Sequence, residues 1–127
     1  MAKRTEKEWE NHRFPRESAL QNYVIKRLNK LPRVHVTKVS GTIYGAGISD
    51  LLICAEGKFV AIELKVGSNK PSDLQKIYLS NIKKAGGIVG VAYTWGDVKR
   101  ILGKAVDVDK LIEEYEEEKR LRKAEEQ

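Results

Sequence analysis

The chain has 127 residues, of which 41% are hydrophobic and 33% charged, a length and balance that predict one domain with its own core. The absence of a long apolar run excludes a membrane-spanning helix and a signal peptide from our expectations. The single cysteine excludes an internal disulfide, so we expect a reducing, cytoplasmic setting. The net charge of +6, with acidic residues gathered at 113–118, favours an anionic partner such as nucleic acid, although a merely soluble protein can also carry it.

The chain is expected to divide into three parts. Residues 1–14 are polar and charged, and form an arm, loose or partly helical, which Trp9 and Phe14 anchor to the body. Residues 15–106 form the globular domain, and residues 107–127 form a highly charged helix or tail whose end frays.

The first long helix is predicted over residues 15–31. Pro15 suits the first helical position, and Pro32 closes the helix. Glu17 falls in the first turn, beside the buried side, where an acidic residue either favours the helix dipole or belongs to a site. The apolar stripe consists of Leu20, Val24, Leu28 and Leu31.

A β-hairpin is predicted in the middle of the chain. Residues 48–55 and 58–66 are rich in strand-forming residues, and Glu56-Gly57 between them suits a tight turn. If these two residues form the loop, Asp50 lies directly opposite Glu63. The segment that precedes the first of these strands contains several glycines.

Two carboxylates and an ammonium group share one face of this hairpin. Like charges that face each other across a sheet are destabilising, so Asp50 and Glu63 need a cation between them, and Mg²⁺ suits such a pair. Lys65 lies one pleat further, within reach of a phosphate or a bound water. The alternative is a solvated salt-bridge cluster at the end of a sheet. The residues of this face are Asp50, Leu52, Cys54, Phe59, Ala61, Glu63 and Lys65, with Cys54 expected to be a small buried hydrophobe.

The remaining elements complete a mixed α/β sheet. A strand at 34–40 precedes the hairpin, and a helix at 72–85, capped by Ser68 or Ser72, carries Gln75 in its first turn beside the core. The parallel crossover from the hairpin to a strand at 88–93 is right-handed. We expect about four strands with helices on both faces, followed by a short helix capped by Asp97 and a last helix from Asp109.

At these positions the chain resembles the VRR-NUC family of the PD-(D/E)xK nuclease superfamily. The resemblance covers roughly residues 15–102 and departs from the family where Ser49 replaces a frequent proline, a position that supplies no ligand. It implies a restriction-endonuclease-like core and a Mg²⁺- or Mn²⁺-dependent endonuclease acting on DNA, in a bacterial or phage-infected cell. The residues that carry it are Glu17, Gly47-Ile48-Ser49-Asp50, Glu63-Leu64-Lys65 and Gln75.

The resemblance also assigns roles to these residues. Asp50, Glu63 and the backbone carbonyl of Leu64 would hold the metal ion, and Glu17 would join through a water or hold a second ion. Lys65 would orient or help to deprotonate the attacking water and offset negative charge, with Gln75 positioning either Lys65 or that water. Candidates for phosphate contacts, which otherwise are ordinary solvated lysines, are Lys38, Lys70 and Lys76.

Small single-domain members of the family are similar to junction resolvases that act as homodimers. Symmetric cutting of a four-way junction (Holliday junction) requires two sites related by a two-fold axis. Trp9, Phe14 and Trp95 have no clear place in the predicted core, so we expect them to be exposed at an interface or on the arm. The alternatives are a nucleic-acid-binding module that has lost catalysis on the same fold, and a basic RNA-binding module. The intact carboxylates argue against the first, and the lack of interleaved strand aromatics against the second.

Overall fold

A mixed four-stranded sheet lies at the centre of the fold, in the order β1-β2-β3-β4. The computed structural model describes residues 3–39 and 47–126. The antiparallel strands are β1 (Val34–Lys38), β2 (Leu51–Ala55) and β3 (Lys58–Leu64), and β4 (Ile88–Ala92) joins β3 in parallel. The predicted first strand ended at Ser40, which is outside the described residues.

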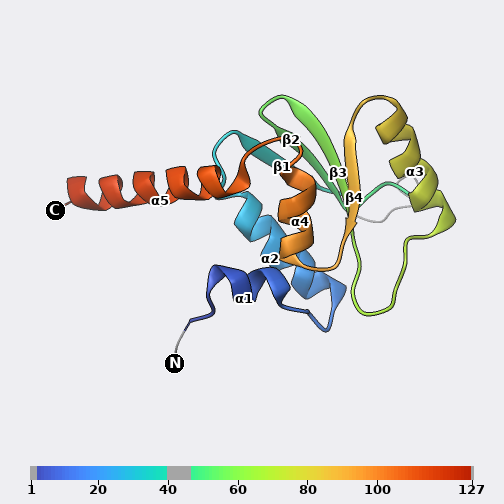
Figure 1. The fold of residues 1–127 in the computed structure, drawn as a ribbon, viewed down its shortest axis with the longest axis horizontal. Coiled ribbons are helices and arrows are strands. Elements are labelled where there is room, and N and C mark those ends of the chain that lie inside the picture. Colours follow the sequence, from blue (N-terminus) through green and yellow to red (C-terminus); the bar gives the residue numbers. More distant parts are fainter. Residues whose placement is uncertain (1–2, 40–46, 127) are drawn as a thin grey trace.

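Helices cover both faces of this sheet, as the sequence predicts. Helices α2 (Glu17–Leu28) and α4 (Trp95–Leu102) pack on one face, and α3 (Asp73–Lys84) packs on β3 and β4 from the other (Figure 1). The described residues contain no helix long and apolar enough to cross a membrane.

The register of the hairpin is the predicted one. Ala55 pairs with Lys58 across the turn, and Leu51 pairs with Ile62 at the other end. Glu56 and its neighbour Gly57 both have positive φ, at 49° and 84°, which is the backbone of the tight primed turn that matches the twist of antiparallel strands. The turn therefore fixes which side chains meet at the opposite end of the hairpin.

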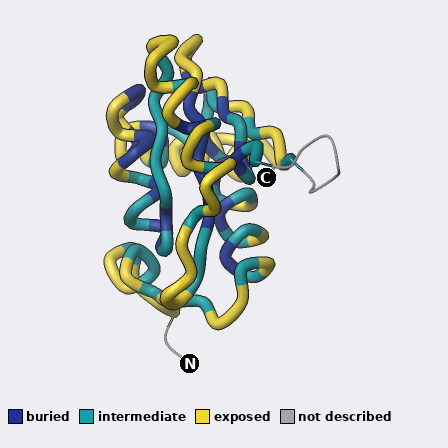
Figure 2. The backbone as a smooth tube through the Cα atoms, turned by 90° about the vertical axis from the view of Figure 1, so that its right-hand side faces the viewer, coloured by how far each residue is buried: buried dark blue, intermediate teal, exposed yellow. Residues whose placement is uncertain are grey.

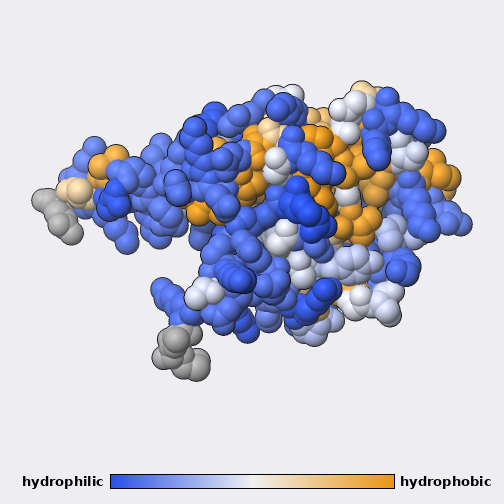
Figure 3. Space-filling view, viewed as in Figure 1, coloured by the Kyte–Doolittle hydropathy of each residue, from blue (hydrophilic) through white to orange (hydrophobic). Residues whose placement is uncertain are grey.

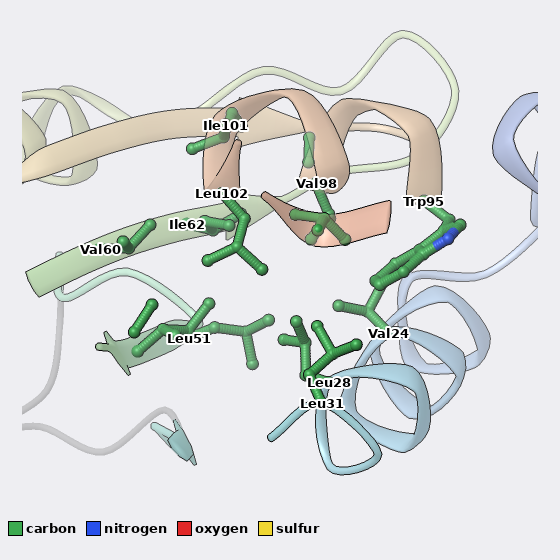
Figure 4. Packing of buried hydrophobic residues seen from close by; sticks show 14 of the residues in the cluster. Val24, Leu28, Leu31, Leu51, Val60, Ile62, Trp95, Val98, Ile101 and Leu102 are labelled. Carbon is green, nitrogen blue, oxygen red and sulfur yellow. The ribbon is translucent and has the colours of Figure 1, made fainter. Parts of the chain in front are cut away.

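The hydrophobic core lies between the sheet and the helices α2 and α4. In Figure 4 the side chains of α2, β2, β3 and α4 point toward one another. Figure 2 shows the buried segments inside the molecule and the turns on the outside. The core side chains that are fully buried include Leu20, Val24, Leu28, Leu51, Val60, Ile62, Leu64, Val98 and Leu102.

Trp95 belongs to this core, and the expectation that it is exposed was wrong. Its exposed fraction is 0%, because it begins the buried stripe of α4 that continues through Val98 and Leu102. The indole Nε1 donates a hydrogen bond of 2.9 Å to the Glu6 carboxylate, which satisfies its one polar group.

The other face of the sheet is only partly covered. Cys54 is exposed, which contradicts the prediction of a buried side chain, and Phe59 beside it keeps 44% of its surface exposed. The reason is that α3 packs on β3 and β4 and leaves the side chains of β1 and β2 open on this face.

The N-terminal segment contains a short helix, α1 (Glu6–Asn11), which packs on α4. Thr5 and Glu8 form a reciprocal capping box at its start. Trp9 stacks on Tyr23 of α2 with ring centroids 4.5 Å apart, so this tryptophan anchors the segment as expected.

Several helix ends differ from prediction. Helix α2 starts at Glu17, so Pro15 precedes it and does not occupy its first position. The cap of α4 is Thr94, and the Asp97 carboxylate instead accepts the backbone N–H of Tyr93 at 2.8 Å. Helix α5 (Val108–Glu125) extends away from the body (Figure 1).

Candidate metal centre

Three carboxylates meet where α2 begins, β2 begins and β3 ends. Glu17 is the first residue of α2, Asp50 directly precedes β2, and Glu63 is the penultimate residue of β3. One oxygen of each side chain lies within 4.8 Å of one oxygen of the other two. The hairpin register brings Asp50 and Glu63 together, and the start of α2 adds Glu17.

Glu63 is the buried member of this cluster. Its side chain is 0% exposed, and Oε1 accepts a hydrogen bond of 2.9 Å from Nε2 of Gln75. Oε2 is buried and has no hydrogen-bond partner among the described residues. Burial raises the pKa of Glu63 to about 8, helped by the neighbouring Asp50 and Glu17 and opposed by the Lys65 ammonium.

The chemistry of this set fits a divalent cation. A buried carboxylate oxygen without a partner requires an explanation, and a second and a third carboxylate next to it add repulsion. Mg²⁺ and Mn²⁺ take hard oxygen ligands, so one ion among Glu17, Asp50 and Glu63 would satisfy the orphan oxygen and cancel the repulsion. The residues present therefore match the ligand type of such an ion.

Asp50 is held in place by the backbone of β3. Its Oδ2 accepts the N–H of Leu64 at 2.8 Å, which continues the hairpin contact beyond the last paired residues. Gly47 starts this segment with φ of 89°, and a Cβ there would lie 2.9 Å from Cβ of Leu74. Only glycine fits that backbone conformation so close to α3, which explains its place in the motif.

Gln75 uses both ends of its amide. Its side-chain Oε1 accepts the backbone N–H of Ser72 at 2.8 Å, and its backbone N–H donates to Ser72 Oγ, which together form the capping box that starts α3. The Nε2 remains free to donate to Glu63. Ser72 is thus one of the two predicted caps, and the helix start positions a side chain of the cluster.

Lys65 also faces the cluster. Its Nζ lies 3.7 Å from Oε1 of Glu63, and 15% of its side chain is exposed. The expected group of Glu17, Asp50, Glu63, Lys65 and Gln75 is therefore assembled at one end of the sheet.

The three lysines predicted to contact phosphates lie around this end without touching the carboxylates. Lys38 ends β1 opposite Leu51, whereas Lys70 and Lys76 flank the start of α3. All three are exposed, and none forms an ion pair within the described part of the chain.

The sequence reasoning did not single out Tyr93. Its hydroxyl donates a hydrogen bond of 2.7 Å to the backbone carbonyl of Asn69, and this fixes the loop that carries Lys70. Tyr93 directly follows β4, which runs parallel to β3, so it emerges at the same end of the sheet as Glu63. Its place directly after a predicted strand was the feature of the sequence that could have indicated this position.

Comparison with known proteins gives one informative match. No family model and no curated protein matches the chain. A solved structure described as "VRR_NUC domain" is similar, with 30% sequence identity and a TM-score of 0.53, and the match covers 78% of this chain and 96% of that one. The chain therefore belongs to the VRR-NUC family and has its restriction-endonuclease-like nuclease fold.

Proposed function

We propose that the protein is a Mg²⁺- or Mn²⁺-dependent endodeoxyribonuclease that hydrolyses phosphodiester bonds in DNA. The observation that carries this proposal is the buried Oε2 of Glu63, which lacks a hydrogen-bond partner among the described residues while Asp50 and Glu17 lie beside it. A site held for stability alone would pair such an oxygen with a donor. Membership of a nuclease family supports the same reaction class.

The ligands of the ion would be Asp50, Glu63 and the backbone carbonyl of Leu64. Glu17 would contribute through a water or hold a second ion. When bound, the ion lowers the pKa of a water and stabilises negative charge on the phosphate.

Lys65 would act on the attacking water and the phosphate. Its ammonium group is close to the cluster and partly exposed, so it can donate a hydrogen bond toward a molecule entering from solvent. In that place it would orient the water and offset the charge that develops on the phosphate oxygens. Gln75 would act one step further away, because its hydrogen bond fixes the orientation of the Glu63 carboxylate.

The DNA backbone would be positioned by Lys38, Lys70 and Lys76. These exposed lysines surround the cluster on β1, on the loop after β3 and on α3. Contacts of this kind set where the duplex lies without reading its sequence.

We further propose a homodimer that prefers branched DNA such as a four-way junction. Two sites related by a two-fold axis would cut both strands symmetrically. Trp95 does not supply the interface because it is buried, and Trp9 already stacks on Tyr23 within the same chain. Exposed apolar side chains on α3 and the open sheet face are better candidates, namely Leu74 at 59%, Ile77 at 56% and Phe59 at 44% exposed.

A substrate panel tests this proposal. The purified protein is incubated with labelled linear duplex, flap, single-stranded and four-way-junction DNA, with and without Mg²⁺. We expect cleavage only with the ion and faster cleavage of the junction. DNA binding without cleavage of any substrate would show instead a binding module that has lost catalysis.

A further inference from the structure

The positive charge of the chain is concentrated in its first part. Residues 1–40 contain ten Lys or Arg and four Glu, whereas residues 41–127 contain fourteen of each sign. The segment that contains α1, α2 and β1 therefore contributes the whole net charge of +6. Figure 3 shows hydrophilic side chains over the α1 region of the surface.

Part of this charge lines a groove between α1, α2 and α5. The groove has a volume of about 530 Å³, and its basic side chains include Lys3, Lys26 and Lys30. None of these three lysines forms an ion pair with the residues that the structure describes. They are thus available to an anion from solvent.

The acidic residues of the groove do not cancel these lysines. Glu6 already accepts hydrogen bonds from Arg27, Trp95 and Lys99, so its charge is compensated within the protein. Those contacts hold the pKa of Glu6 below its usual value, against the effect of burial. Only Glu116, on the α5 wall, opposes the lysines from within the groove.

The groove lies on the other side of α2 from the carboxylate cluster. Lys26 stands nine residues after Glu17 on the same helix, which places it ~14 Å along the helix axis at 1.5 Å per residue and about half a turn around that axis at 3.6 residues per turn. The groove and the cluster would therefore contact different parts of a bound DNA molecule.

We propose that this groove is a second nucleic-acid contact, which binds the phosphate backbone of DNA away from the carboxylate cluster through Lys3, Lys26 and Lys30. The proposal rests on the proposed nuclease function, because the groove would hold another part of the DNA that is cleaved at the cluster. The phosphate contact is common to a duplex arm and to a single strand.

The test is the salt dependence of DNA binding in EDTA, which prevents metal-dependent cleavage. The Lys26→Ala/Lys30→Ala protein should bind more weakly, and the slope of log affinity against log salt should become less negative by between about 1 and 2. The matched control is Lys83→Ala/Lys84→Ala, which removes the same charge from exposed positions at the end of α3, on the opposite face of the sheet.

A second variant tests the removal of a negative charge from the groove. Glu116→Gln removes the one uncompensated acid of the groove and should tighten binding, whereas Glu125→Gln at the exposed end of α5 should not. Parallel titrations with duplex and single-stranded DNA tell which form of strand occupies the groove. Equal slopes for the Lys26/Lys30 variant and its control would overturn the proposal, even in a protein that cleaves normally. A changed slope in a protein that never cleaves would support the groove and refute the nuclease.

Discussion

Gln75 donates a hydrogen bond of 2.9 Å to the buried carboxylate of Glu63, and the same side chain caps helix α3 through Ser72. This one amide links the start of a helix to the orientation of the innermost acid of the cluster. It occupies Oε1 of Glu63 and leaves the buried Oε2 without a hydrogen-bond partner among the described residues.

Gln75→Ala should therefore lower both stability and activity. Loss of the capping box costs about 1 kcal/mol of unfolding free energy, and loss of the contact to Glu63 should reduce cleavage by ~10- to 100-fold. Ser72→Ala is the matched control, because it removes the side-chain cap and leaves the contact between Gln75 and Glu63 possible. Thermal melts and cleavage rates measure the two effects. An equal loss of activity in the two variants would contradict a specific role for Gln75.

The raised pKa of Glu63 predicts how stability depends on pH in the absence of metal. Because the folded protein holds this proton more tightly than the unfolded chain, the stabilisation is complete below the ordinary pKa of 4.5 and is lost as the pH rises to about 8. Glu63→Gln cannot ionise, so above pH 8 in EDTA its melting temperature should exceed that of the wild type. Below pH 5 the two should be close. Differential scanning calorimetry across this pH range checks the prediction, and parallel pH curves would contradict it.

Lys65 should matter to the rate far more than to DNA affinity. A single acid–base or electrostatic group contributes ~10² to 10⁴ in rate, whereas binding rests on many phosphate contacts. Lys65→Met keeps much of the length of the side chain and should be as inactive as Lys65→Ala. Single-turnover cleavage and binding in EDTA separate the two effects. Near wild-type cleavage by the Met variant would leave Lys65 as a surface residue of the strand end.

Assembly should depend on the exposed apolar side chains of α3. We expect a homodimer at micromolar concentration, and Ile77→Asp should dissociate it because a charge would be buried in the interface. Leu121→Asp is the control, since Leu121 is similarly exposed, at 54%, on the extended part of α5. Analytical ultracentrifugation gives the answer. A wild-type monomer that cleaves linear and junction DNA equally would exclude the resolvase-like function.

The sequence predicted the hairpin and what it brings together because a two-residue turn leaves only one register. Glu56-Gly57 fixed the pairing, and the alternation of side chains then placed Asp50 and Glu63 at one end of the same face. The contact between Gln75 and Glu63 was not predictable in detail, because it depends on the angle at which α3 meets the sheet.

The errors have physical causes as well. Trp95 was expected to be exposed, although its spacing to Val98 and Leu102 fits a helical stripe, and the buried indole needed an acceptor from the distant Glu6. Cys54 was expected to be buried because the strand is apolar, but the cover of a sheet face depends on where α3 lies. Both depend on tertiary contacts between segments far apart in the sequence.

The central claim is that the cluster of Glu17, Asp50 and Glu63 is a catalytic metal centre. The most direct test compares cleavage of labelled four-way-junction DNA by the wild type in Mg²⁺, by the wild type in excess EDTA, and by Asp50→Asn in Mg²⁺, with the fold of each protein checked by circular dichroism. We expect cleavage in the first sample alone, with all proteins folded. Undiminished cleavage by the wild type after complete chelation, or by Asp50→Asn, would contradict the account.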